Sequence, residues 1–417
     1  MSQTETLADV VIVGGGMVGA TLACALGDTS LKVVLLEAGP GNYALPEQGY
    51  ELRVSAITRA SQCIFETLGV WPGIIARRVG PYRDMHVWDA TGSGVIHFDS
   101  AELGEATLGH IIENNVITAA LYERLNAFEN VVVINNSQTS SITIEAENAS
   151  LALKDGSRIK TKLLVAADGS RSGIRQQFGI SVRGWDYDHT AVVTYVKTEK
   201  SHQETAWQRF LPTGPVAFLP LAEDYCSIVW STQADQAKQL TEMADDQFCE
   251  ALAEAFDHTL GKIESTGPRA CFPLRFFVAN EYVKPRLALV GDAAHTIHPL
   301  AGQGVNLGLA DVASLAEVLI EASTEGKDIG SMSVLRRYER WRKADSLSLF
   351  VAMDSLKRLF SSQHSGLRWL RNFGLSLTDR LAPVKNHLVR SAMGLNENPI
   401  EGRLPRLSRG IPLKERH

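Results

Sequence analysis

The stretch that decides the fold is Val10-Val11-Ile12-Val13-Gly14-Gly15-Gly16-Met17-Val18-Gly19. A β-branched run ends here in a GxGxxG motif, an Ala- and Leu-rich segment continues to Leu26, and a second apolar run occupies residues 33–36. Strand, turn, helix and strand in close succession are typical of the βαβ unit of a parallel sheet. The sequence therefore predicts an α/β fold that begins with a Rossmann-like, dinucleotide-type unit.

The three motif glycines have separate tasks in such a turn. Gly14 permits the tight turn, Gly16 lets a pyrophosphate approach the backbone, and Gly19 lets the helix pack on the strand. Glu37 ends the second strand, 23 residues after Gly14, where an acid hydrogen-bonds a ribose 2′-hydroxyl. We expect an adenosine ribose without a 2′-phosphate, hence FAD or NAD rather than NADP. The alternative is a glycine-rich turn without a ligand.

Two later apolar runs end in an acid beside a glycine. Residues 163–167 lead into Asp168-Gly169, at the carboxyl edge of a buried strand, where open α/β sheets bind ligands. The alternative for this motif is an ordinary turn before a serine-capped helix. Residues 287–290 lead into Gly291-Asp292, and an Asp in that place can bond ribityl hydroxyls.

A glycine-rich loop then leads into an Ala- and Leu-rich helix that begins near Gly304. The backbone N–H groups of Gln303 to Asn306 can face the N1/O2 edge of a flavin, and the positive end of the helix can stabilise the anion of reduced flavin. His295 and His298 are three residues apart in this loop, but no third ligand is near them in the sequence. We therefore expect no metal site.

The dinucleotide-type domain is predicted to be discontinuous. Residues 81–104 and 181–279 are richer in aromatic and alternating stretches, which predicts an antiparallel sheet inserted into it as a substrate domain. Long helical patterns dominate from about residue 333 onward. The predicted division is a FAD-type domain at 1–80, 105–180 and 280–355, a substrate sheet at 81–104 and 181–279, and a helical C-terminal extension at 356–417.

Composition and charge narrow the function class. The 417-residue chain has a net charge of −6, yet residues 361–417 hold ten Lys or Arg against four Asp or Glu, so the rest carries −12. Five cysteines without a CxxC pair suggest neither disulfides nor zinc, and residues 1–9 contain no basic residue, so we expect no signal peptide. We expect a cytoplasmic protein that can associate peripherally with the inner membrane and binds no nucleic acid.

The order of GxGxxG, Asp-Gly and Gly-Asp motifs resembles the single-component flavoprotein aromatic hydroxylases, the p-hydroxybenzoate hydroxylase superfamily (class A FAD-dependent monooxygenases). Residues 298–311 resemble the signature of the ubiquinone-biosynthesis hydroxylases that act on polyprenylphenols. Further matches lie at 52–57, 112–115, 207–212 and 338–339.

The resemblance implies a set of FAD contacts. Asn114 departs from the pattern, since Arg or Gln often holds its position, and Arg53 could instead be a plain surface arginine. The expected cofactor-binding residues are Gly14, Gly16, Met17, Val18, Gly19, Glu37, Arg53, Asn114, Asp168, Gly291, Asp292, Gly302, Gln303, Gly304, Val305 and Asn306.

The resemblance also implies the chemistry. A flavin C4a-hydroperoxide, formed with O₂, would hydroxylate the ring of a polyprenylphenol, and residues 52–57 and 207–212 favour position C5. Electrons would come from NAD(P)H or a ferredoxin-type donor. No residue declares itself as a catalytic base, because Tyr195, Tyr225 and His189 fit packed sheet positions better. Two alternatives stay open: a flavin reductase or dehydrogenase of a polyprenyl substrate, and a FAD-bearing structural subunit of a ubiquinone-biosynthesis complex.

The basic C-terminal segment has its own expectation. Leu370, Phe373, Leu377 and Leu381 fall at near-helical spacing, with arginines at 368, 371 and 380 beside them. Such a helix could lie on an anionic membrane or dock a partner of the biosynthetic complex. The alternative is a helix packed on the protein's own core with its arginines in solvent.

Overall fold

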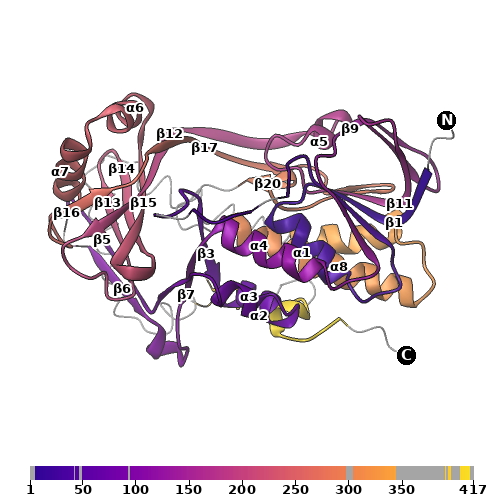
Figure 1. Cartoon of the computed structure of the whole chain (residues 1–417), viewed down its shortest axis with the longest axis horizontal. Coiled ribbons are helices and arrows are strands. Elements are labelled where there is room, and N and C mark those ends of the chain that lie inside the picture. The colour runs from indigo at the N-terminus through magenta and orange to yellow at the C-terminus, as the bar shows by residue number, and fades with distance from the viewer. Residues whose placement is uncertain are drawn as a thin grey trace.

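The structure is a computed structural model that describes residues 5–41, 43–46, 49–92, 94–296, 304–343, 390, 393–395 and 404–413. Two large sheets make up most of it, joined by the long strands β12 (Val182–Thr198) and β17 (Ala270–Ala279), which run across the top of Figure 1. The second sheet carries two helices on its outer face, and its inner face is turned toward the first sheet.

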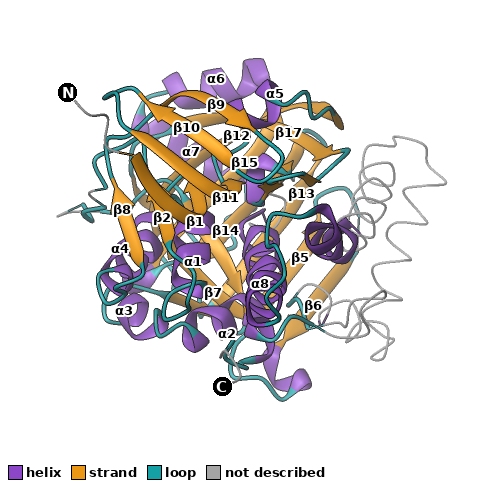
Figure 2. Cartoon of the chain, turned by 90° about the vertical axis from the view of Figure 1, so that its right-hand side faces the viewer, coloured by secondary structure: helices purple, strands orange, loops and turns teal. Residues whose placement is uncertain are grey.

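The first sheet has the order β18-β19-β11-β1-β2-β8. Strands β19, β11, β1, β2 and β8 pair in parallel, and β10 and β9 extend the sheet from β11 as an antiparallel hairpin (Figure 2). Their bounds are β1 Glu5–Val13, β2 Val33–Leu36, β8 Val131–Ile134, β9 Thr139–Ile144, β10 Ala149–Leu153, β11 Arg158–Ala166, β18 Val283–Lys284 and β19 Leu287–Leu289. This confirms the predicted α/β class.

Helices cover this sheet because its strands are apolar on both faces. Helix α1 packs between α4 and α8 (Figure 1). The helices of this part are α1 Met17–Ala25, α2 Arg59–Thr67, α3 Trp71–Ile75, α4 Asn114–Leu125, α5 Gly173–Gln177 and α8 Gly304–Thr324, with 3₁₀ turns η1 Ser100–Leu103, η3 Gly291–Ala293 and η4 Leu407–Arg409; residues 332–343 are also helical. A small antiparallel sheet, β3 Val54–Thr58, β7 Gly109–Glu113 and β4 Gly80–Tyr82, stands beside them.

The second sheet has the order β20-β17-β12-β15-β14-β13-β5-β6, with β16 on β12. Its remaining elements are β5 Asp84–Asp89, β6 Val95–Asp99, β13 Thr205–Leu211, β14 Gly214–Pro220, β15 Tyr225–Gln233, β16 Ile263–Thr266, β20 His295–Thr296, η2 Ala222–Asp224, α6 Ala234–Glu242 and α7 Asp245–Ala255. The sheet is antiparallel as predicted except that β5 runs parallel to β13. These two strands are more than 100 residues apart in the sequence and are not joined by a hairpin. Their connection therefore does not require an antiparallel pairing.

The two faces of the second sheet differ in side-chain size. Val216, Phe218, Ile228 and Trp230 point to one face, where they form a core with α6 and α7. Because successive strand residues alternate between faces, their neighbours point the other way, toward the first sheet. That inner face forms one wall of the pocket described below.

The described part of the C-terminal region packs on the first domain. Leu407 in η4 is buried, η4 contacts α2 and α8, and the Arg406 backbone N–H donates to Glu317 at 2.8 Å (Figure 1, yellow). The amphipathic pattern from Leu370 to Leu381, with its arginines, lies outside the described residues. None of the described helices is long and apolar enough to cross a membrane.

Candidate active site

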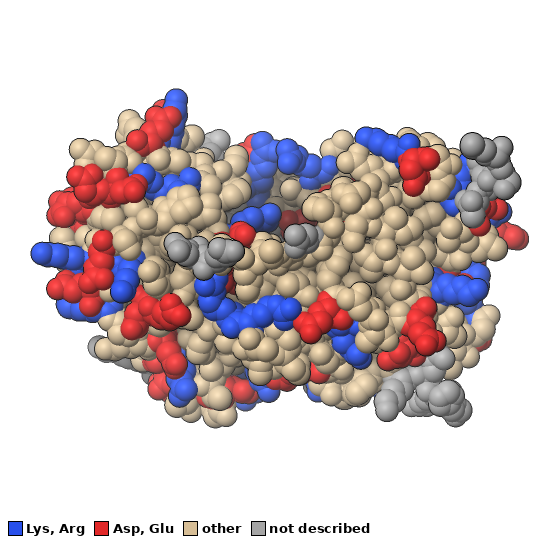
Figure 3. All heavy atoms as spheres, viewed as in Figure 1, with Lys and Arg blue, Asp and Glu red and all other residues tan. Residues whose placement is uncertain are grey.

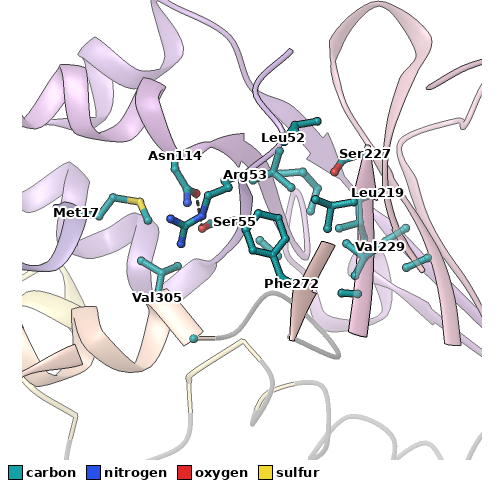
Figure 4. Close-up of a pocket in the computed structure, with 18 of the residues that line it drawn as sticks. Met17, Leu52, Arg53, Ser55, Asn114, Leu219, Ser227, Val229, Phe272 and Val305 are labelled. Carbon is teal, nitrogen blue, oxygen red and sulfur yellow. Dashed lines mark hydrogen bonds between the residues drawn. The ribbon is translucent and has the colours of Figure 1, made fainter. Parts of the chain in front are cut away.

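A cavity of about 800 Å³ lies between the loops of the first sheet and the inner face of the second (Figure 4). In space-filling view the molecule is hollowed between its two halves, with Lys and Arg side chains around the hollow (Figure 3). The predicted cofactor residues that line the cavity are Gly16, Met17, Val18, Arg53, Asn114, Asp292, Gly304 and Val305. Residues far apart in the sequence therefore meet at one wall.

The glycine turn has the geometry that a nucleotide-binding turn needs. Gly14 has φ +111°, and a Cβ there would overlap the Ala167 carbonyl. A Cβ on Gly19 would overlap the Gly14 carbonyl oxygen, so Gly19 allows helix α1 to approach the turn. Gly16 differs, because a Cβ there would meet nothing within 4 Å and would project beside the cavity. The open side of Gly16 leaves backbone accessible to a phosphate at the N-terminus of α1.

Glu37 fixes the glycine turn by accepting two backbone hydrogen bonds. Its two carboxylate oxygens each accept a backbone N–H, from Gly15 and from Gly39, both at 2.7 Å. Carboxylate oxygens each have a second lone pair, so a ribose hydroxyl can still donate to Glu37. Its contact with the ribose remains a prediction.

Asp168 shows both features considered for its motif. Ser172 caps the short helix α5 by accepting the Arg175 N–H at 3.0 Å, while Asp168 Oδ2 accepts the Ile174 N–H at 3.2 Å. Asp168 Oδ1 is buried and has no hydrogen-bond partner among the described residues. Asp168 itself is not among the residues that line the cavity, although Gly169 beside it is, so its contact with a ligand remains a prediction.

Arg175, which sequence reasoning did not single out, connects two of the motifs. Its side chain is buried and donates to the Ser170 carbonyl at 2.8 Å and to the Ala293 carbonyl at 2.9 Å. Burial lowers the pKa of its guanidinium, and Asp168 partly offsets that effect. The Asp-Gly and Gly-Asp loops are thus fixed to each other by one side chain.

Asp292 and Arg53 both line the cavity. Burial among the cavity walls raises the pKa of the Asp292 carboxyl, although its side chain is open to the cavity, and the charges of His295 and Arg53 oppose the rise. Arg53 extends into the cavity near Ser55 and Asn114 (Figure 4). Arg53 is exposed and lines the cavity, so its contact with a ligand remains a prediction.

Two asparagines of the predicted set are held by the protein itself. Asn114 Oδ1 accepts the Ser55 hydroxyl at 2.7 Å (Figure 4). Asn306 donates to the Ala56 carbonyl at 2.7 Å and accepts the Thr58 N–H at 3.1 Å, which ties the start of α8 to β3. The N-terminus of α8 nevertheless meets the cavity at Gly304 and Val305. Gly302 and Gln303 lie outside the described residues.

A buried charge cluster supports the Gly-Asp loop from behind. Asp311 Oδ2 lies 2.7 Å from His295 Nε2 and accepts the Gly291 N–H at 2.9 Å, while Asp311 Oδ1 accepts Arg342 Nε at 2.7 Å. Burial alone would raise the pKa of Asp311, but the charges and hydrogen bonds of His295 and Arg342 hold it below its usual value. Sequence reasoning missed this role of Asp311, whose signal was its place at the end of the 298–311 pattern.

Most of the described residues on the opposite wall of the cavity are apolar, and none of them is Asp, Glu, His or Lys. Tyr195 and Tyr225 pack against Tyr50, with ring centroids 5.6 and 5.1 Å from it, and neither they nor His189 line the cavity. The loops of the predicted nucleotide-binding motifs and a helix N-terminus therefore lie at one side of the cavity. The other side is an apolar surface with a few uncharged polar groups. This arrangement suits a bound redox cofactor that acts on an apolar organic ring.

Comparisons with known proteins agree with this geometry. The FAD binding domain family matches residues 7–347. The human ubiquinone biosynthesis monooxygenase COQ6, mitochondrial, is 39% identical, with 94% of this chain and 93% of the relative covered. The 3-demethoxyubiquinol 3-hydroxylase of Escherichia coli K12 is 38% identical, with 94% of this chain and all of the relative covered.

A solved structure shows the same fold. The p-nitrophenol 4-monooxygenase PnpA from Pseudomonas putida DLL-E4 superposes with a TM-score of 0.77 at 21% identity, over 94% of this chain and 99% of that one. The cofactor is FAD and the protein is an FAD-dependent monooxygenase. This chain belongs to the FAD binding domain family and, within it, to the family of the ubiquinone-biosynthesis monooxygenases.

Proposed function

We propose that this protein hydroxylates the aromatic ring of a polyprenylphenol intermediate in ubiquinone biosynthesis, using FAD and O₂. The observation that carries the proposal is the single cavity that joins the loops of all three nucleotide-type motifs to an apolar sheet face. A redox cofactor held at the loops has direct access to a ring held on the sheet. The reaction inserts one oxygen atom of O₂ into a ring C–H bond and reduces the other to water with two electrons and two protons.

The residues around the cavity fit FAD. When bound, FAD supplies the redox chemistry that activates O₂. The open backbone at Gly16 admits the pyrophosphate, and the Asp292 carboxylate, which lines the cavity, is an acceptor for cofactor hydroxyls. The N-terminus of α8 at Gly304 supplies positive potential where negative charge develops on reduction. These roles extend the expected cofactor contacts and are part of the proposal.

The sheet side excludes water from the reacting ring. Val193, Ala217, Leu219 and Val229 line it, and Phe272 stands where the two halves of the cavity meet (Figure 4). A dry site protects a reactive oxygen donor from wasteful release as hydrogen peroxide. Hydroxylation at C5 is the proposed regiochemistry, and either NAD(P)H or a ferredoxin-type protein is the proposed electron source.

Membrane contact and membership of a biosynthetic complex are proposed for the basic C-terminal segment. Deleting everything after Ser361 is a poor test, because it also removes Leu407 from the core and Met393 from the cavity wall. Replacing Arg368, Arg371 and Arg380 by Gln is cleaner. We expect the triple variant to keep FAD and lose binding to anionic liposomes or to the complex, and unchanged binding to both would refute this part.

The function is tested by deleting the gene in its host and identifying the quinone intermediate that accumulates. A precursor that lacks one ring hydroxyl is expected, and its substitution pattern names the ring position. Normal quinone levels would contradict the proposal. Accumulation of a precursor with an unreduced side chain would favour the reductase alternative, and restoration of quinone by a variant unable to bind FAD would favour the structural-subunit alternative.

A further inference from the structure

Three uncharged polar side chains lie on the central strands of the second sheet, where the cavity wall is otherwise apolar. Gln208 on β13 and Ser227 and Ser231 on β15 all line the cavity, with exposed fractions of 7%, 2% and 3%. None of the three side chains has a hydrogen-bond partner within the described parts of the chain, and none of their polar atoms is among the fully enclosed unpartnered ones, so all three are open to the cavity. A ligand in the cavity can therefore hydrogen-bond to them.

The alternation of side chains along β13 and β15 shows that all three polar residues point to the cavity face of the second sheet. On β13, Trp207 packs in the core under α7 and Arg209 donates to the Ala255 carbonyl at 3.0 Å, so Gln208 between them points the other way. On β15, Ile228 and Trp230 lie in that same core. The polar side chains therefore alternate with bulky core residues and all point into the cavity.

The register places the three groups around an apolar floor. Gln208 pairs with Ala217, and Ala217 pairs with Val229, so these residues form a row across β13, β14 and β15. Ser227 and Ser231 lie on either side of Val229 along β15, roughly 13 Å apart at 3.3 Å per residue. Gln208 is two strands away, roughly 10 Å from β15. A substituted ring that lies on Ala217 and Val229 has polar groups near its edge on three sides.

We propose that Gln208, Ser227 and Ser231 determine substrate specificity by hydrogen-bonding the oxygen substituents of a neutral ring. This inference rests on the proposed function and sharpens its substrate class to a ring with more than one oxygen substituent. The Gln208 amide both donates and accepts, so it can accept a phenol O–H or donate to an ether oxygen. A serine hydroxyl has the same double capacity. All three side chains are uncharged, which suits hydroxyl and alkoxy groups.

The test measures ligand discrimination in the oxidised holoenzyme, where no turnover occurs. Two soluble probes are titrated while the flavin absorbance is followed: 2-prenylphenol, and 4-methoxy-2-prenylphenol, which adds one oxygen and leaves the C5 position free. Wild-type protein should prefer the methoxy probe. Gln208→Met keeps the side-chain length but not the hydrogen bonds, and should lose about tenfold or more in affinity for the methoxy probe while changing less for the other. Gln239→Met, at an exposed position on α6, is the matched control.

The two serines are tested independently, because Ser→Ala removes only a hydroxyl group. Ser227→Ala and Ser231→Ala should each reduce the preference for the methoxy probe and should increase hydrogen peroxide release per electron pair during turnover with it. The inference is overturned if Gln208→Met and both serine variants keep the wild-type preference, or lose affinity for both probes equally. If Gln208→Met does not retain FAD, the two serine variants decide.

The outcomes separate this inference from the proposed function. Wild-type protein that hydroxylates the probes while its variants discriminate unchanged would refute only the role of the three side chains. Wild-type protein that binds neither probe would refute both.

Discussion

Adding a methyl group at Gly16 or at Gly19 distinguishes a glycine that leaves room for a ligand from one that lets the protein pack. Gly16→Ala adds a Cβ that meets nothing within 4 Å in the protein, at a backbone conformation of φ −68° and ψ −178° that any residue adopts. Gly19→Ala adds a Cβ that overlaps the Gly14 carbonyl oxygen. The first methyl group should collide only with the cofactor, and the second with the protein.

The cost of the added methyl group should appear in FAD binding for one variant and in the free energy of unfolding for the other. An alanine at a compatible glycine position stabilises by about 0.4–1 kcal/mol. Glycine is preferred to alanine at a helix N-cap by a similar amount, so Gly16→Ala should leave the free energy of unfolding of the FAD-free protein nearly unchanged. Overpacking costs about 1–3 kcal/mol. In Gly16→Ala that cost falls on FAD binding, as a roughly 5- to 150-fold weaker Kd. In Gly19→Ala it falls on the free energy of unfolding.

The assay combines urea unfolding of the FAD-free proteins with FAD titration by quenching of flavin fluorescence. Wild-type FAD affinity in Gly16→Ala would refute the assignment of the pyrophosphate to this turn. Equal loss of unfolding free energy in the two variants would refute the distinction between an open and a packed glycine.

Other perturbations follow from single contacts. Asp311→Asn leaves the buried Arg342 and His295 without their carboxylate and should cost about 3–5 kcal/mol in urea unfolding at pH 7. The folded-state pKa of Asp311 is depressed, so the stability that its carboxylate contributes is fully present above the unfolded pKa of about 3.9 and is lost as pH falls through the folded pKa. The difference in unfolding free energy between variant and wild type should therefore narrow only below about pH 4. A difference that stays constant at lower pH would contradict this. Leu407→Ala should cost about 2–5 kcal/mol in thermal or urea unfolding if the C-terminal region is part of the core, and no loss would disprove that. Asp292→Asn should weaken FAD binding, measured by titration, without lowering the unfolding free energy of the FAD-free protein, because it removes a carboxylate whose pKa burial raises; a destabilised FAD-free protein would argue for a structural role instead.

Local patterns predicted the parts of the fold that depend on local geometry. The glycine turn follows from residues 10–19, and its backbone has the positive φ at Gly14 and the close approach at Gly19 that the motif requires. The apolar runs before Asp168 and Asp292 do lie at β11 and β19, neighbours in one parallel sheet. Period and motif are sufficient here because each feature depends on a few consecutive residues.

Long-range contacts explain what sequence reasoning missed. The Asn306 side chain bonds Ala56 and Thr58, about 250 positions earlier in the chain, so its structural use could not be seen locally. The alternation that places Gln208 and Ser227 on one face was visible, but which face meets a cavity depends on where α6 and α7 pack. The parallel pairing of β5 with β13 has no local signal either, because no turn connects the two strands.

The most direct test of the central claim is oxygen incorporation by the purified, FAD-loaded protein under ¹⁸O₂. With a short-chain prenylphenol and a chemical or NAD(P)H-driven source of electrons, one ¹⁸O atom should appear on the ring of the product and the other in water, and the labelled carbon should be C5. A product without ¹⁸O, or electron consumption that yields only hydrogen peroxide in the presence of bound prenylphenol, would contradict the assignment of this protein as a ring hydroxylase.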